Sequence, residues 1–488
     1  MLSSHVSTNQ EWRPLESPSR GLQGMEGSYG GVIPGAAALG AAFAAFSTDS
    51  VGAAFLSIGM SLIVIMSTRS RSRCPGWPQI WIAASLGLMF VLHPAAVLAG
   101  GRLNIPFHGT GSIVDGYAEA IGLGALLCGG IAFGFSQPGA FWRGSRQAVP
   151  RDVSNTAMVG FAMWVTLLAG SLYTAYLVTS GAGIGSISKV GLNTVGASAS
   201  TAYLYLAPLL LVPAALLLLL SASLTVSKAN RRRWRVAAFL LTTVLVVGYL
   251  PTGSRIYILL AAAPYLMAFR WLTGRGYSGI QVSVMASVAI VGILALRDTT
   301  PGNGPLENLR TVVAAPSTSL QTFATGADTE MVDGLALAVQ VVPDAVAHAP
   351  GSSLYTTLLG PIPRGLWPEK PVRADGRLNS YLFGAQGVRA TDASVAYSIA
   401  GSFYLDLGAP GVVLGAWLLG VALAYLQGLG AAAVAHADGL TILIVAAAVP
   451  LIPVLLRGTL DDTAARALFV IGPLLYARRF TKRRPLNA

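Results

Sequence analysis

The sequence predicts an all-α polytopic membrane protein with about 12 transmembrane helices and one large, partly helical extracytoplasmic loop. Of its 488 residues, 53% are hydrophobic and only 11% are charged, and the mean hydropathy is +0.62. The apolar segments are continuous and rich in Leu, Ala and Val, whereas the strands of a membrane barrel alternate. A single long polar stretch, at 297–395, interrupts these segments late in the chain.

The expected spans follow the apolar segments in order, and the first two are short. They lie at 32–46, 50–66, 80–99, 116–135, 153–178, 201–226, 236–250, 256–271, 279–296, 410–428, 439–456 and 463–476. Gly411 and Gly415, four residues apart in one span, predict close packing between helices.

These spans divide the chain into five parts. Residues 1–30 are polar and predict a disordered cytoplasmic tail, and 31–296 hold the first nine spans. Residues 297–395 form the extracytoplasmic loop or cap domain. Residues 396–478 hold a re-entrant or interfacial segment and the last three spans, and 479–488 form a basic cytoplasmic tail.

The basic residues set the expected orientation, because Lys and Arg in short loops stay on the cytoplasmic side. With both termini inside, 20 of the 32 basic residues are cytoplasmic and the 297–395 loop faces outward. The net charge of +12 is thus explained by topology and predicts no nucleic-acid partner. The five histidines lack metal-ligand spacing, and nucleotide-binding loops are absent, so neither a metal nor a cofactor is expected.

The polar loop itself predicts two helices. Asp328, Glu330 and Asp333 precede or begin an apolar run that ends near Val342, as is typical of a helix N-terminus. Ser352 is placed to cap a second short helix that continues through Leu359, with its apolar face supplied by leucines.

Cations expected at the outer face predict binding of a phosphate or diphosphate. Arg255 follows Pro-Thr-Gly-Ser in a very short junction between two spans, and Arg457 directly follows an apolar span. Between 364 and 389 the loop carries a local charge of +3, which includes Arg364, Arg373 and Arg377. The structural alternatives are a snorkelling interfacial arginine, a solvated run of charge and a helix-end salt bridge.

Aromatic residues are interleaved with these charges at Trp367, Tyr381, Tyr397 and Tyr404. Anchoring at the membrane interface is the common role of such residues. Stacking against sugar rings is the functional alternative.

Three segments in this order resemble the Wzy-type O-antigen and capsular oligosaccharide repeat-unit polymerases. They are the turn at 252–255, the Ile-Pro-Arg-x-Leu-Trp-Pro-x-Lys-Pro segment at 362–371, and the Ser-Phe-Tyr-Leu-Asp-Leu-Gly-x-x-Gly segment at 402–411. The likeness covers the layout from about residue 200 to the end. The family often has glutamate where Ser402 stands, so no catalytic role is carried over there.

The resemblance implies a metal-independent, membrane-embedded glycosyltransferase of the type C group in a bacterial plasma (inner) membrane. Such an enzyme transfers a growing glycan from one polyprenyl diphosphate to the sugar end of another lipid-linked unit at the outer leaflet. Arginines then stabilise the departing diphosphate, and the lipid bilayer, a chain-length regulator and a flippase join the expected partners.

A general base must take the proton of the acceptor hydroxyl. We favour Asp392, with Glu369 as the second candidate, because a carboxylate surrounded by arginines is a weaker proton acceptor. Two other functions stay open: an O-antigen ligase, for which His348 is the outer-loop histidine, and a lipid-glycan transporter or flippase. A transporter usually shows two related halves, whereas the polar mass of this chain lies in one late loop.

Overall fold

The computed structural model describes residues 77–98, 114–135, 151–180, 204–250, 255–273, 312–324, 329–359, 376–382 and 397–483, with single positions at 59, 137, 143, 310, 362, 367, 369 and 371. Nearly all of these residues are helical, which confirms the predicted fold class. Seven described helices are long and apolar enough to cross a membrane. They are Pro78–Val97, Gly116–Phe135, Asn155–Thr179, Leu204–Leu224, Arg255–Thr273, Ser398–Ala435 and Gly439–Arg457.

Several of these spans are built from consecutive elements, as the element order shows. The order is α4 (Trp77–Gly87), η1 (Leu88–Leu92), α5 (His93–Leu98), α6 (Val114–Phe135), β1 (Arg151–Val153), α8 (Asn155–Ser180), η3 (Leu204–Leu210), α10 (Leu211–Leu224), α11 (Lys228–Tyr249), α12 (Arg255–Thr273), α15 (Pro316–Ala324), α16 (Met331–Val341), α17 (Ser352–Leu359), α19 (Ser398–Ala435), α20 (Gly439–Ala448), α21 (Leu451–Arg457), α22 (Leu460–Ala477), η4 (Arg478–Phe480) and β2 (Thr481–Arg483).

The count of twelve spans stays a prediction. The expected spans at 32–46, 50–66 and 279–296 lie outside the described residues, apart from Gly59. Two more, at 236–250 and 463–476, fall in α11 and α22, which are not among the seven. Both helices carry charge, because α11 opens with a basic turn and the first half of α22 holds Asp461, Asp462 and Arg466.

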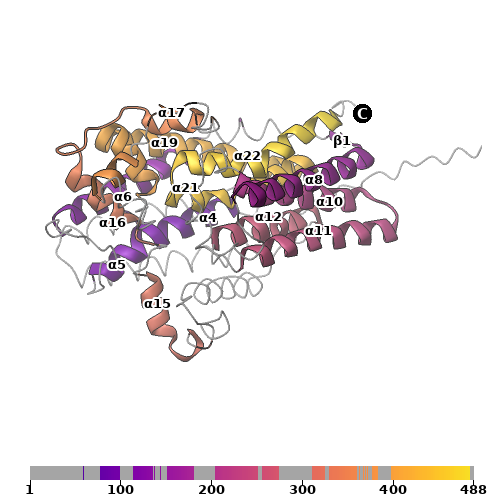
Figure 1. Cartoon of the computed structure of the whole chain (residues 1–488), viewed down its shortest axis with the longest axis horizontal. Helices are drawn as coiled ribbons and strands as arrows, with labels where there is room; N and C mark the ends of the chain where they lie inside the picture. Colours follow the sequence, from indigo (N-terminus) through magenta and orange to yellow (C-terminus); the bar gives the residue numbers. More distant parts are fainter. Residues whose placement is uncertain are drawn as a thin grey trace, which may run out of the picture.

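The longest helix, α19, packs against α6 along the length of the bundle (Figure 1). Glycines make this approach close, because a Cβ added at Gly134 would meet the Trp417 carbonyl and one at Gly420 would meet the Ile131 carbonyl. The glycines that the sequence singled out behave differently. Gly411 and Gly415 pack against Phe403 of the same helix, across a kink, and not against a neighbouring helix.

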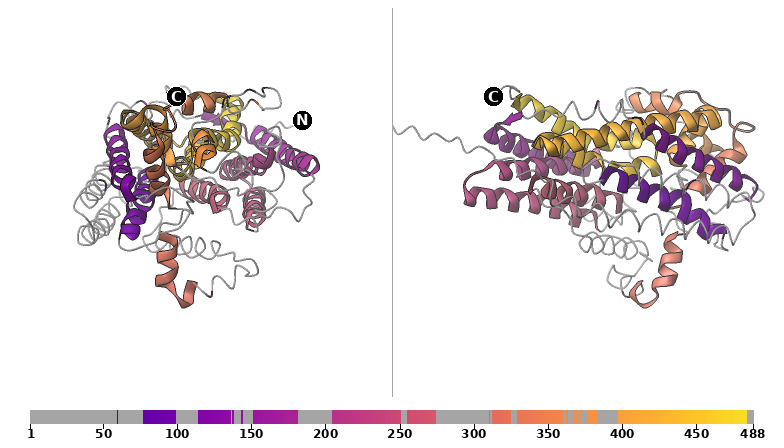
Figure 2. Two further views of the ribbon diagram at one scale, coloured as in Figure 1. Left: turned by 60° about the vertical axis from the view of Figure 1, so that its left-hand side comes forward. Right: turned by 180° about the vertical axis from the view of Figure 1, so that it is seen from behind.

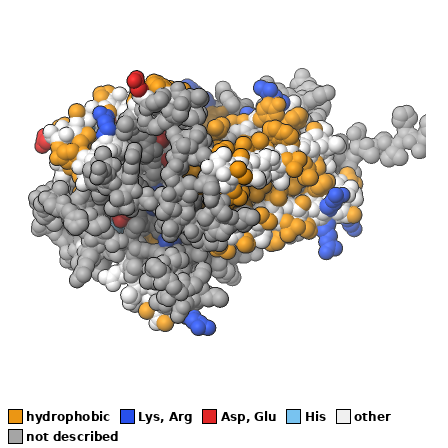
Figure 3. Space-filling view, viewed as in Figure 1, with side chains coloured by type: hydrophobic (Ala, Val, Ile, Leu, Met, Phe, Trp, Pro, Cys, Tyr) orange, Lys and Arg blue, Asp and Glu red, His pale blue; other side chains and the backbone are white. Residues whose placement is uncertain are grey.

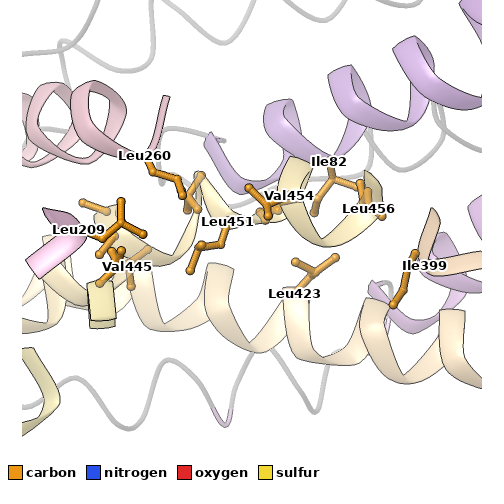
Figure 4. Packing of buried hydrophobic residues seen from close by; sticks show 14 of the residues in the cluster. Ile82, Leu209, Leu260, Ile399, Leu423, Val445, Leu451, Val454 and Leu456 are labelled. Carbon is orange, nitrogen blue, oxygen red and sulfur yellow. The ribbon is translucent and has the colours of Figure 1, made fainter. Parts of the chain in front are cut away.

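The apolar core runs continuously through the bundle. Figure 4 shows Ile82 of α4, Leu260 of α12, Leu423 of α19 and Val454 of α21 converging from four helices. Because these side chains come from distant parts of the sequence, their packing determines how the helices are placed relative to one another.

The two helices predicted in the polar loop are present, but they differ in environment. Helix α16 is buried against α6 and α19, and nine of its residues are shielded from solvent. Helix α17 lies on the outside of the bundle against α19 and α22 (Figure 2). Of the two predicted helices, one therefore lies in the interior and one at the surface.

The opposite end of the bundle is basic. Strand β1 pairs antiparallel with β2, so Arg151 lies opposite Arg483 and the C-terminal segment meets the start of α8. The basic N-terminal turn of α11 lies at this same end (Figure 1). Figure 3 shows a largely hydrophobic surface over the bundle with Lys and Arg side chains at its end.

Candidate functional site

The candidate site is a group of charged and aromatic side chains around Arg466, a residue inside α22. Arg466 is only 8% exposed and forms an ion pair with Asp462, one helical turn earlier. Its guanidinium carbon lies 5.4 Å from the ring centroid of Tyr257 on α12. An arginine held by a carboxylate and an aromatic face keeps its charge while most of its surface is shielded from water.

Tyrosines form the floor beneath this arginine. Tyr257 stacks on Tyr249 with ring centroids 4.6 Å apart and forms a side-chain hydrogen bond with Tyr205. These three rings come from η3, α11 and α12. The arginine is therefore held over a rigid aromatic platform assembled from three helices.

Arg457 joins this group from the end of α21. It interacts electrostatically with Arg466, with Asp462 and with Glu330, the residue that precedes α16. Arg255 begins α12 two residues before Tyr257, so its backbone lies within one turn of the same platform. We call Arg255, Arg457, Arg466, Asp462, Glu330 and Tyr257 the arginine cluster.

Of the five arginines predicted from the sequence, the structure brings Arg255 and Arg457 to one end of the bundle. Arg377 is exposed on the short helix at 376–382. Arg364 and Arg373 lie outside the described residues, as does Asp392.

Of the other predicted site residues, three are exposed and two are buried. Trp367 and Tyr381 are exposed, as is Glu369. Tyr397 is buried and donates a hydrogen bond to Asn379 Oδ1 at 2.6 Å. Tyr404 is also buried and donates to the Val342 carbonyl at 3.1 Å.

The segment at 402–411 fastens the loop to α19. Asp406 accepts hydrogen bonds from the Ser352 hydroxyl at 2.9 Å and the Ser353 amide at 3.1 Å, at the N-terminus of α17. The Leu405 carbonyl accepts from the Ala349 amide at 2.9 Å. Gly408 then takes a φ of 68°, a conformation that favours glycine and sets the kink in α19.

His348 lies beside this kink. Its ring is edge-on to Tyr404 with centroids 5.7 Å apart, and its Nδ1 is buried without a hydrogen-bond partner. The histidine on which the ligase alternative depends is thus packed against Tyr404 and Gly408 of α19.

A second buried polar group was missed by sequence reasoning. His93 and Asp333, both 0% exposed, meet with His93 Nε2 2.8 Å from Asp333 Oδ1, and Tyr117 donates to the same oxygen at 3.0 Å. His93 Nδ1 lies 2.7 Å from the Ala324 carbonyl. Because that carbonyl only accepts, His93 Nδ1 donates this hydrogen bond, and Nε2 makes the contact with Asp333.

This network ties α16 of the loop to α5 and α6. Asp333 was interpreted from the sequence as a charge at a helix N-terminus, but its side chain points into the bundle. The signal that would have found it is an ionisable residue in an apolar run, because such residues in membrane proteins pair with one another. The partner was not predictable, since it lies 240 residues away.

Arg466 was missed for a similar reason. It lies within the expected span at 463–476, where a single arginine was counted as part of the apolar segment. Among the described residues, no three His, Cys, Asp or Glu side chains gather as a metal site. The cluster instead presents guanidinium groups, which match phosphate oxygens.

No protein-family model, curated protein or solved structure matches this chain.

Proposed function

We propose that this protein polymerises oligosaccharide repeat units carried on polyprenyl diphosphate. It transfers a growing glycan from one lipid-linked unit to the sugar end of another at the outer leaflet of a bacterial inner membrane. The proposal joins the resemblance in the three sequence segments to an arrangement of cations at one end of an apolar helix bundle.

The observation that carries the proposal is the arginine cluster. Arg457 interacts electrostatically with Arg466 and with Glu330, the residue that precedes α16. With Arg255, the cluster holds three cations against the carboxylates of Asp462 and Glu330, and this positive surplus favours an anion. A diphosphate that enters along the lipid surface meets this requirement.

The orientation follows from the two ends of the bundle. The basic α11 start and the β1–β2 pair lie at one end, which we assign to the cytoplasm by the positive-inside rule. The arginine cluster and the 297–395 loop then face outward. The finer topology that we propose has about twelve spans and both termini inside.

In the proposed reaction, an acceptor hydroxyl oxygen bonds to the anomeric carbon of the donor sugar. The bond between that carbon and the diphosphate oxygen breaks, and the diphosphate leaves with the electron pair. Arg255, Arg457 and Arg466 stabilise the negative charge that develops on this leaving group. The hydroxyl proton passes to a carboxylate.

We propose Asp392 as this base, with Glu369 as the second candidate. Asp406 holds the N-terminus of α17, and Asp462 is paired with Arg466. Both carboxylates therefore have structural partners. Glu369 is exposed, as an acceptor-side group requires.

Replacing Arg466 tests the proposal. A hydrogen bond to a charged group contributes roughly 1.5–3 kcal/mol, so Arg466→Ala should lower turnover by about tenfold to more than a hundredfold. Arg466→Lys should restore activity only in part, because it keeps the charge but loses the planar fork. The assay measures polymer formed by reconstituted protein from polyprenyl-diphosphate-linked repeats, which serve as both donor and acceptor.

Arg479→Ala is the matched control, because Arg479 also lies over an aromatic ring, that of Tyr476, but at the basic end of the bundle. It should polymerise at the parental rate. Arg255→Ala and Arg457→Ala test the same site without removing the Arg466–Asp462 pair. If all three cluster variants fold, as judged by size exclusion, and polymerise like the parent, the diphosphate site lies elsewhere.

A further inference from the structure

Helix α17 has an inverted distribution of polarity. Its inward residues Ser352 and Thr356 are buried, whereas Leu354 and Leu358 on the outward side are 62% and 74% exposed. A surface helix in water places its apolar stripe toward the core and its polar residues outward. The leucines that the sequence predicted as the packing face of this helix are the ones that face away from the protein.

The serines and threonines of α17 all form hydrogen bonds within the protein, which leaves the Tyr355 hydroxyl as its other polar side-chain group. Ser352 bonds Asp406, Ser353 bonds the Ser402 carbonyl, and Thr356 and Thr357 bond carbonyls one turn earlier. The helix has no charged residue. Its outward face therefore offers no charged side chain to water, and the Tyr355 hydroxyl is the one polar group near that face.

The apolar stripe continues beyond the helix and onto its neighbours. Ile362 follows Leu358 by four residues and is also exposed, and Trp367 lies a little further along. Helix α17 packs against α19 and α22, whose exposed side chains include Leu414, Leu418 and Leu468. The outward face of α17 is thus an extension of the surface that the apolar helices present to lipid.

We propose that the outer face of α17, formed by Leu354, Leu358 and Ile362, inserts into the lipid bilayer at the edge of the helix bundle. The occupant of this face is lipid because α19, against which α17 packs and which exposes Leu414 and Leu418, is long enough to span a membrane. Trp367 is exposed, and tryptophan gathers at such an interface. The insertion holds α17 at the membrane surface, and it does not depend on the catalytic proposal.

Spin labelling of the full chain tests this placement. A nitroxide is attached to Leu358→Cys, and separately to Leu354→Cys, in a Cys74→Ser, Cys128→Ala background reconstituted in nanodiscs of phosphatidylethanolamine and phosphatidylglycerol. Oxygen, which partitions into lipid, and a water-soluble nickel chelate are compared as relaxing agents. Labels at Leu167→Cys in α8 and Ser380→Cys on the exposed helix at 376–382 give the lipid and water references.

We expect the ratio of oxygen to nickel accessibility at both α17 positions to match the Leu167 reference and to exceed the Ser380 value several-fold. A ratio equal to that at Ser380 would overturn the proposal. Shielding from both agents would also overturn it, because the face would then be covered by a protein partner or by a second copy of the chain.

Discussion

Single ionisable side chains decide how the loop meets the bundle. His93 and Asp333 lie fully inside the protein, where an isolated charge is very costly. Their contact, together with the Tyr117 hydroxyl on the same oxygen, offsets this cost. The network therefore specifies one docked position for α16 and not merely an apolar collapse of the loop.

Breaking this network at one residue should cost more than removing it at both. Asp333→Leu leaves His93 Nε2 buried without its acceptor, and we expect a loss of about 3 kcal/mol in unfolding free energy. In His93→Leu/Asp333→Leu part of this loss should return, because the Ala324 carbonyl keeps its bond from Thr329 at 2.9 Å. Unfolding of the purified variants in mixed micelles measures the difference.

The matched control is Asp344→Leu, which removes a carboxylate from an exposed position just after α16. It should change stability little. If the single and double variants are equally unstable, His93 and Asp333 are not coupled, and the docking of α16 depends on its apolar contacts alone.

At the scale of the element, sequence patterns predicted helices well and their surroundings less well. The helix expected from Ser352 through Leu359 has those bounds in the structure, because apolar spacing is a local signal. The predicted cap by Ser352 is wrong: Ser352 is the first helical residue, and Asp406 accepts hydrogen bonds from the Ser352 hydroxyl and the Ser353 amide. The exposure of the leucines of this helix was not predicted, because the neighbouring helices decide whether that face meets water, lipid or protein. Arg255 and Arg457 were found because they lie at the boundaries of apolar segments, whereas Arg466 lies inside one.

The pairing of α6 with α19 was also beyond the sequence. Gly130, Gly134 and Gly420 gain their meaning only when the two helices are placed side by side, where an added methyl group would overlap the partner's atoms. Gly411 and Gly415, with a spacing typical of helix association, serve a kink instead. The spacing of small residues alone does not show which part of the protein packs against them.

This close approach can be tested with glycine substitutions. Gly134→Ala and Gly420→Ala should each lower the unfolding free energy by about 1–3 kcal/mol, because the new methyl groups meet backbone atoms that cannot move aside freely. Gly160→Ala in α8 is the control, since nothing lies within 4 Å of its added Cβ. It should be neutral or slightly stabilising, because alanine favours a helix over glycine.

Thermal unfolding in detergent, followed by loss of the monodisperse peak on size exclusion, gives the comparison. These substitutions should lower stability but leave the Arg466–Asp462 pair intact, because that pair lies in α22 and not in α6 or α19. Equal unfolding temperatures for Gly134→Ala, Gly420→Ala and Gly160→Ala would show that α6 and α19 separate easily in solution.

For the molecule as a whole, the two ends of the bundle differ in chemistry. One end carries the basic start of α11, Arg478 and Arg479 of η4 and the β1–β2 pair. At the other end Figure 1 shows α16 and α17, and the arginine cluster is connected to the start of α16 through Glu330. If basic residues are retained on the cytoplasmic side, the diphosphate site that we propose lies at the outer leaflet, where a lipid-borne donor needs no nucleotide.

This orientation predicts opposite labelling of two exposed positions. In a Cys74→Ser, Cys128→Ala background, a cysteine at Ser380 should react with a membrane-impermeant maleimide in intact cells, because the 297–395 loop faces outward. A cysteine at Asn230, in the basic turn that begins α11, should react only after permeabilisation. Both positions are exposed, so differences in burial within the protein do not account for a difference in labelling.

Labelling of Asn230→Cys in intact cells together with protection of Ser380→Cys would show that the protein has the opposite orientation in the membrane. The arginine cluster would then face the cytoplasm, and the proposed reaction at the outer leaflet would have to be abandoned even if Arg466 proved essential.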